Sequence, residues 1–505
     1  MIRELADLAR IVTSRGLANF PLMDLDSEIP TKENQLIVAL RLNPAATKSQ
    51  LIREVYGANT AASKEAFWQL CARVLGKLLN HLYFLDHTDK RHLVSRRYEM
   101  AVLDMLHQAI VLVEEGESRL AVQRLRRCLL LAERDDFLHY AILAARHLRN
   151  LYANLRRPQQ YKALTKKHGE LTRRLALENE AEELYLDVRN DIAGTVLTRQ
   201  ALLRKFDTYI PQLEQFHQQV RTANTFTYLY RTRLTQQEML GNYAEILRLA
   251  LEAIQQLEEG QLNPRRFDAR YTYYMTVYAH LRLKQLTQGL MLAEQYLPAF
   301  HPSSNNWFAF QENYLLLALY AGNYEVARQI QVAALANSFY PRLSPAARER
   351  WELYGAYVDF LLPPLPKKRK ARPVEWTLTL PDFNRDKRGY HVAILVLQFL
   401  HYLRLRKLDE VMLRLERLRK YQQTHLREDA TLRSRLFIRL LALLVEKDFN
   451  AKACAERGQN LLTKLLETPQ PGEAYAQIEI VPYEALWELV LKIVGEGAPL
   501  ASVAL

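Results

Sequence analysis

From about residue 97 onward the sequence is a succession of amphipathic segments, each about a dozen to twenty residues long and joined by short polar turns. Their apolar residues recur every three or four positions, which is typical of helices that bury one face. Residues that interrupt helices are scarce, since only 16 Gly and 19 Pro occur among 505 residues. Alternating runs of Val, Ile and Thr are scarce too. The pattern predicts an all-α protein.

One short motif recurs at the turns between these segments. In its clearest form Gly322 is followed by Asn323 and Tyr324, with Ala327 three residues further on. Gly241 begins a second copy, and looser copies lie near Gly116, Lys284, Arg406 and Lys447. Neighbouring turns are about 40 residues apart. The motif resembles the turn of tetratricopeptide repeat proteins. The resemblance implies an α-solenoid of stacked helix hairpins whose concave surface binds a partner.

The sequence divides into four segments. The sequence predicts a compact helical unit over residues 1–95, the tetratricopeptide-like repeats over residues 96–361, and further helical repeats over residues 390–505. Residues 362–389 separate the two repeat segments. This stretch contains several prolines and the basic run Lys367–Arg372. Because proline removes a backbone donor and like charges repel, it predicts an exposed loop.

The first unit allows two interpretations. Its predicted helices cover residues 32–42, 49–56 and 63–85, a length pattern found in DNA-binding helix-turn-helix units. Residues 40–57, LRLNPAATKSQLIREVYG, resemble the opening of winged-helix regulators that carry a bacterial transcriptional activator domain. Under that interpretation Lys64, Arg73 and Lys77 would contact DNA. Otherwise the unit caps the repeat array, whose terminal repeats need a polar outer face.

The chain is basic, with 69 Lys and Arg against 56 Asp and Glu and a formal net charge of +13. Such a surplus favours acidic partners, although here we expect it to be spread over a large surface. Two basic stretches rich in aromatic residues could bind unpaired RNA bases and phosphates. The arginines concerned are Arg231, Arg233, Arg266 and Arg270. The alternative to RNA binding is that these aromatic residues pack between helices, as aromatic residues at this spacing also do.

Motifs for catalysis are missing from the sequence: it has no GxxxxGK[ST], GxGxxG, GxSxG or HExxH motif. One local cluster of metal-ligand residue types occurs, without a cysteine pair; its members are His81, Asp86, His87, Asp89 and His92. The three cysteines are far apart. We therefore expect no enzymatic activity, no cofactor and no metal.

Location and partners follow from the same sequence. No apolar run approaches the roughly 18 residues that span a bilayer, and the N-terminus lacks a signal-peptide core, so we expect a cytoplasmic protein without membrane contact. The leading hypothesis is a scaffold that binds a protein or peptide on its concave face. The alternatives are a transcriptional regulator and an RNA-binding repeat protein; the oligomeric state stays open. The partner-binding candidates are Tyr243, Tyr273, Tyr278, Tyr314 and Tyr320.

Overall fold

The computed structural model describes residues 7–8, 22–23, 31–89, 91–194, 196–362, 388–426, 431–470 and 479–496. These residues form 20 α-helices and three short 3-10 helices, and no strand occurs among them. The prediction of an all-α protein is therefore confirmed for the described part of the chain. The basic run of residues 367–372 and the loop around it lie outside the described residues.

The first helices are α2 (Lys32–Leu42), α3 (Lys48–Tyr56) and α4 (Ala61–His81). Each begins after a threonine, and the hydroxyls of Thr31 and Thr60 accept hydrogen bonds from backbone N–H groups of the first turn. The predicted helices start within two residues of these positions. The three helices enclose a small apolar core of their own.

The following helices pack mainly on their neighbours in the chain. The large α8 exceeds every predicted segment, since it runs for 36 residues. The bounds of this middle group are α5 (Val94–Glu114), α6 (Ser118–Arg134), α7 (Leu138–Asn154), α8 (Pro158–Ala193), α9 (Val196–Val220), α10 (Ala223–Leu240), α11 (Tyr243–Glu258), α12 (Ala269–Arg282) and α13 (Leu286–Tyr296).

Most tight turns between these helices share one backbone geometry. At Gly322 the chain enters the left-handed region, with φ of +69°. The N–H of Gly322 donates to the carbonyl of Leu319 at 3.2 Å, and that of Asn323 to the carbonyl of Ala318 at 2.8 Å. This pair of bonds is the Schellman motif that ends many helices. The same two bonds close the turns at Gly116, Asp136, Arg156, Gly241, Lys284 and Arg406.

Arg156 adopts this left-handed geometry without being glycine, with φ of +53°. A residue other than glycine pays about 1–2 kcal/mol to adopt this conformation. Glycine avoids that cost, but part of the gain is lost because glycine has more conformational entropy in the unfolded chain. We expect Arg156→Gly to raise the free energy of unfolding by about 0.5–1 kcal/mol in urea titrations. The control Gly322→Ala should lower it by a similar amount, although a Cβ there meets no atom within 4 Å. A loss of stability in Arg156→Gly would contradict the role assigned to the turn.

The last group of helices surrounds the largest core of the molecule. Its aromatic centre includes Trp351, Tyr357, Phe399, Phe437 and Trp487, all at most 2% exposed. The helices that contribute are α14 (Asn305–Tyr320), α15 (Tyr324–Ala336), α16 (Pro345–Leu361), α18 (Arg388–Arg404), α19 (Leu408–His425), α20 (Leu432–Glu446), α21 (Ala451–Glu467) and α22 (Tyr483–Gly495).

The C-terminal helix α22 connects turns that are distant in the sequence. Near its N-terminal end, Glu484 pairs with Lys284 of the α12–α13 turn. At its other end, Arg406 of the α18–α19 turn donates to the carbonyl of Ile493 at 3.2 Å. Just before α22, the Tyr320 hydroxyl at the end of α14 donates to the carbonyl of Glu479 at 2.7 Å. The last described helix thus ties three hairpins together.

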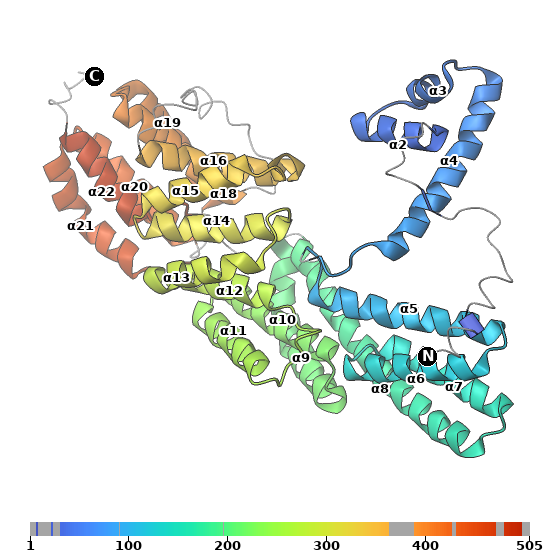
Figure 1. Cartoon of the computed structure of the whole chain (residues 1–505). Helices are drawn as coiled ribbons and strands as arrows, with labels where there is room; N and C mark the ends of the chain where they lie inside the picture. Colours follow the sequence, from blue (N-terminus) through green and yellow to red (C-terminus); the bar gives the residue numbers. More distant parts are fainter. Residues whose placement is uncertain are drawn as a thin grey trace.

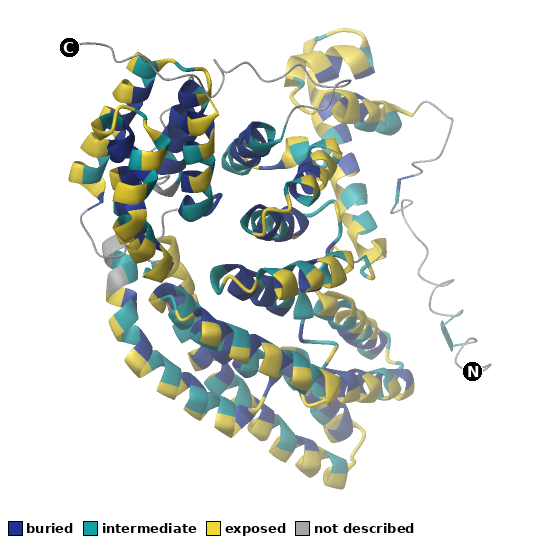
Figure 2. Cartoon of the chain, turned by 90° about the vertical axis from the view of Figure 1, so that its left-hand side faces the viewer, coloured by how far each residue is buried: buried dark blue, intermediate teal, exposed yellow. Residues whose placement is uncertain are grey.

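Figure 1 shows how these groups are arranged: the helices from α5 onward follow one another in a curved row, and α2–α4 stand apart from it. Figure 2 shows that the buried residues lie on the sides at which neighbouring helices meet. The outward sides are largely exposed. Side chains on the outward surfaces are therefore the ones available to a partner.

Acid should weaken the core through His401, whose ring meets the Phe360 ring edge-to-face at 4.9 Å. Burial, together with the charge of Arg404, lowers the pKa of His401 to about 4. The unfolded chain, with an ordinary pKa near 6.5, therefore binds this proton first as the pH falls. Stability present above pH 6.5 is lost below it, by about 2 kcal/mol between pH 7 and pH 5.

Urea titrations at the two pH values measure the free energy of unfolding. Its difference between pH 7 and pH 5 should be smaller in His401→Gln than in the natural protein, by about 2 kcal/mol. The control His139→Gln changes an exposed residue of α7 and should keep the wild-type difference. An unchanged difference in His401→Gln would refute the assignment to this residue.

A candidate partner-binding groove

The five tyrosines proposed as partner contacts lie at several helix contacts, and Tyr243, Tyr278 and Tyr320 lie near Arg282. Tyr243 and Tyr278 are buried, with ring centroids 5.8 Å apart in an edge-to-face contact. Tyr273 stacks on Tyr296 at 4.1 Å. Tyr314 and Tyr320 are half-buried and pack against the large core. These rings mostly serve packing, so the proposal below does not rest on them.

Two of the four arginines proposed to contact RNA cross between helices. Arg231 lies over the Tyr271 ring at 4.8 Å and donates to the Tyr185 hydroxyl at 3.3 Å. Arg233 of α10 pairs with Glu214 of α9. Both side chains therefore already have partners within the protein.

The other two arginines hold loops in place. Arg266 donates to the carbonyls of Asp135 and Asp136 at 3.2 and 3.3 Å and lies 4.2 Å from the Phe137 ring. Burial lowers the pKa of Arg266. Arg270 pairs with Asp268 and is 13% exposed. The structure thus gives all four arginines internal contacts.

The residues proposed to contact DNA lie on α4. Lys64 and Arg73 are exposed, and Lys77 is half-buried. Arg73 and Lys77 both point towards Glu33 of α2, at 3.7 and 2.8 Å. Neither Arg73 nor Lys77 turns into the repeat array. Both side chains are directed at the Glu33 carboxylate, which belongs to the same helical unit.

One segment of the described chain is dense in positive charge. Residues 118–174 contain 14 Lys and Arg and only four Asp and Glu, against +13 for the whole chain. They form α6, α7 and the first half of α8. Three of the four acids are already in ion pairs: Glu133 with Lys167, Asp135 with Arg134 and Asp136 with Arg174. At least ten of the cations therefore have no counter-charge within the segment.

A groove runs through this basic segment, between α6 and α8 and over the end of α7. It consists of two cavities of about 290 and 350 Å³ that share Glu133 and Ala163. Along α8 the lining extends from Gln160 to Arg174, which is about 21 Å of helix. Leucines form its floor; they are Leu129, Leu130, Leu148, Leu164 and Leu171. Figure 1 shows the three helices side by side.

Cations stand at the rim of this groove. Arg126 donates to the Tyr152 hydroxyl at 2.6 Å, which fixes its guanidinium beside the leucine floor. Lys167 pairs with Glu133 at 2.8 Å, so the acid nearest the middle of the groove is neutralised. Lys166 is exposed and pairs with no residue that the structure describes. Leucines lie along the groove, and its charged lining residues, four basic and two acidic, give it a net positive charge.

A polar network holds the far end of the groove in place. Glu178 of α8 is 2% exposed, and it accepts hydrogen bonds from Thr222 and from Asn224 Nδ2, the latter at 2.9 Å. The backbone N–H of Ala223 donates to Asp136 at 3.2 Å. Burial raises the pKa of Asp136, an effect that these contacts and the nearby arginines oppose. The network joins α8, α10 and the α6–α7 turn into one rigid support.

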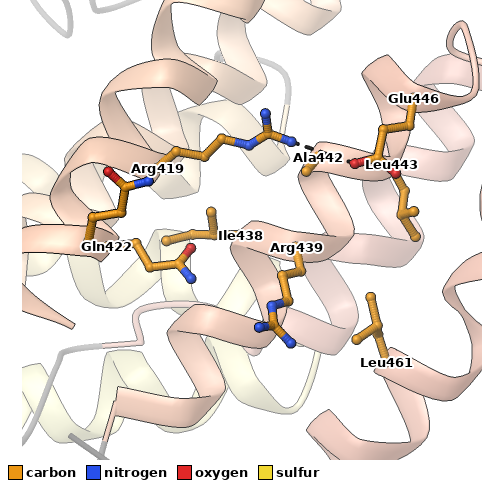
Figure 3. A pocket seen from close by; sticks show the side chains of 9 residues that line it. Arg419, Gln422, Ile438, Arg439, Ala442, Leu443, Glu446 and Leu461 are labelled. Carbon is orange, nitrogen blue, oxygen red and sulfur yellow. Dashed lines mark ion pairs between the residues drawn. The ribbon is translucent and has the colours of Figure 1, made fainter. Parts of the chain in front are cut away.

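A second cavity of about 520 Å³ lies between α19, α20 and α21. Figure 3 shows Arg419 reaching from α19 towards Glu446 of α20, with Arg439 nearby. The Arg419–Glu446 distance is 3.6 Å. Residues 408–467 contain 12 Lys and Arg against nine Asp and Glu. This cavity therefore lacks the concentrated charge of the groove on α6–α8.

The structure brings no metal site together in the part of the chain that it describes: no group of three or more potential ligands was found there. In the predicted cluster, Asp89 pairs with Arg91, and this contact lowers its pKa to about 2. No described helix is long and apolar enough to cross a membrane.

Known proteins give no guide to this groove. No family model, no curated protein and no solved structure matches the chain. The assignment of a function therefore rests on the residues themselves. The signal that sequence reasoning missed is local: a charge count over windows of about 50–60 residues gives a net charge of +10 for residues 118–174, and one of +9 for residues 367–423, whereas the total for the chain dilutes both.

Proposed function

We propose that this protein is a non-enzymatic scaffold whose helices form a tetratricopeptide-like α-solenoid, and that its groove on α6–α8 binds an acidic segment of a partner protein. The repeated Schellman turns and the packing of each helix on its neighbours support the architecture. A solenoid leaves long surfaces open to partners. The observation that carries the function is the leucine-floored groove inside a segment with 14 cations and four anions.

The shape and chemistry of the groove define the partner. A groove about 21 Å long that has leucines along its lining fits an amphipathic helix, which inserts apolar residues every three or four positions. The unpaired cations at the rim attract carboxylates on the flanks of that helix and speed its association. The acidic segment should therefore have leucine-like residues on one face and Glu or Asp beside them.

The same cations would also attract nucleic acid, which needs positive charge but no apolar floor. The experiment therefore also tests the two alternatives, a DNA-binding regulator and an RNA-binding protein. The probes are labelled helical peptides of about 20 residues: one with a leucine face and glutamate flanks, one with the same leucines and lysine flanks, and one with the glutamates kept but the leucines scattered. Single-stranded RNA and duplex DNA complete the set.

Binding to the full chain is measured by fluorescence anisotropy. We expect the glutamate-flanked peptide to bind most tightly, the scattered peptide at least 10-fold more weakly, and the lysine-flanked peptide not at all. Affinity should fall as salt rises from 50 to 200 mM, because the charges at the rim are exposed. Preference for nucleic acid over every peptide would replace this proposal with one of the alternatives.

A further inference from the structure

Helix α4 has a second apolar face that is largely exposed. Its first face, with Phe67, Leu70 and Val74, is buried in the core of the α2–α4 unit. On the other side lie Trp68, Leu75 and Leu79, and the short 3-10 helix Leu82–Phe84 and Leu85 follow α4; all seven of these large side chains are more than half exposed. Monomeric proteins rarely expose so many neighbouring apolar residues, and such patches usually mark interfaces.

The spacing of this face is that of a helix that pairs with another helix. Trp68, Ala72, Leu75, Leu79 and Leu82 follow one another at intervals of four, three, four and three residues. This is the heptad spacing that keeps one seam of a helix facing a partner. We call these five residues the α4 apolar face. From Trp68 to Leu79 it lies on α4 and spans about 17 Å, and Leu82 begins the short 3-10 helix that follows.

Charge is absent from the α4 apolar face. Between residues 66 and 85 only Arg73 and Lys77 are permanently charged. Both contact Glu33 on the other side of the helix. Lys48 of α3 lies over the Trp68 ring at 4.0 Å, at the edge of the face. An acidic or nucleic-acid partner would find little to pair with here, so the partner must itself be apolar.

The described part of the segment that precedes α2 lies elsewhere on α4. The backbone N–H of Met23 donates to His81 Nε2 at 2.9 Å, and Met23 is 5% exposed in the core of the unit. His81 is six residues beyond Leu75, which places it about 120° away around the helix. This contact leads the chain to the buried side of α4.

A second copy of this chain offers the uncharged, apolar partner surface that the α4 apolar face requires. About Leu75 the face is self-complementary, because in an antiparallel pair the small Ala72 meets Leu79 and Trp68 meets Leu82. A large side chain has about 150–250 Å² of surface. The four large side chains of the α4 apolar face, each somewhat more than half exposed, therefore offer roughly 400–500 Å² per copy, which is at the small end of specific interfaces. An uncharged face also lets two copies with +13 each approach with little repulsion.

We propose that two copies of this chain form a two-fold dimer through the α4 apolar face, with the axis beside Leu75. Figure 1 shows α4 standing away from the row of helices that begins at α5, and the large side chains of the α4 apolar face are more than half exposed. The dimer presents two α6–α8 grooves. The inference is independent of what those grooves bind.

Light scattering coupled to size exclusion measures the mass of the full chain directly. At about 10 µM we expect twice the chain mass of 58.9 kDa for the natural protein and a single chain mass for Leu75→Lys. The control Leu466→Lys changes a leucine of α21 with a similar exposed fraction and should stay dimeric. A monomeric natural protein, or a dimer that persists in Leu75→Lys, would overturn the proposal.

Cysteine cross-linking tests the same contact without disturbing it. Leu75→Cys should form a disulfide between two copies under mild oxidation, because the axis brings the two positions within the roughly 7 Å that a disulfide requires. Arg73→Cys, equally exposed but on the opposite side of α4, should not. Equal cross-linking of both variants, or of neither, would contradict the proposed axis.

Discussion

Replacing Arg433 by alanine is expected to lower the free energy of unfolding by about 4 kcal/mol. Arg433 is 3% exposed on α20 and donates to Glu479 at 2.8 Å and to Glu484 at 2.7 Å. It also donates to the carbonyls of Leu465 and Thr468 at 2.7 and 2.9 Å. Without the guanidinium, the buried carboxylate of Glu479 loses its counter-charge and the end of α21 loses its cap. Circular dichroism in urea measures the change.

Two further variants make this prediction specific. Arg439→Ala removes an exposed arginine from the same helix and should change the free energy of unfolding by less than about 0.5 kcal/mol. Adding Glu479→Gln to Arg433→Ala should recover part of the loss, because the unpaired buried charge is then gone. If the double variant were as unstable as the sum of the single ones, the two side chains would not be coupled.

The second large effect concerns binding. Arg126→Glu together with Lys166→Glu places two negative charges at the rim of the groove. We expect this double variant to bind the glutamate-flanked peptide roughly 30-fold more weakly, which corresponds to about 1 kcal/mol for each reversed charge. Lys452→Glu with Arg457→Glu changes the net charge equally at exposed sites of α21 and should have little effect. Equal weakening in both pairs would mean that the total charge, and not the groove, attracts the peptide.

Much of the helical arrangement could be predicted because its signals are local. Caps such as Thr31 and apolar periodicity define where a helix begins and which face it buries. Turns at Gly241 and Gly322 were predictable because glycine readily takes the left-handed geometry that a Schellman turn requires. The turns at Asp136 and Arg156 have the same geometry without glycine, so their residues gave no such signal.

The candidate site was harder to predict because it depends on which side of each helix meets another. Tyr243 and Tyr278 have the residue type of a binding surface, yet their rings pack on each other inside the fold. Arg266 lies in a basic aromatic stretch, yet it holds the α6–α7 turn. A single sequence states residue types and spacing, whereas exposure is decided by contacts between helices distant in the chain.

The α4 apolar face also shows why sequence and structure must be combined. Its residues are what a core helix would contain, and the sequence predicts a helix there without difficulty. Only the structure separates the side that is buried against α2 and α3 from the side that is largely exposed. The same separation gives α4 an apolar surface where a DNA-reading helix would present polar side chains.

Photo-cross-linking tests the central claim, the binding of an acidic amphipathic segment in the α6–α8 groove, most directly. A glutamate-flanked peptide with a photoreactive phenylalanine in place of one leucine is irradiated with the full chain, and the attached residues are identified by mass spectrometry. The account predicts attachment to Leu129, Leu130 or Leu164 on the groove floor, and loss of attachment in Arg126→Glu with Lys166→Glu. Attachment at α19–α21 or across the whole surface would contradict it.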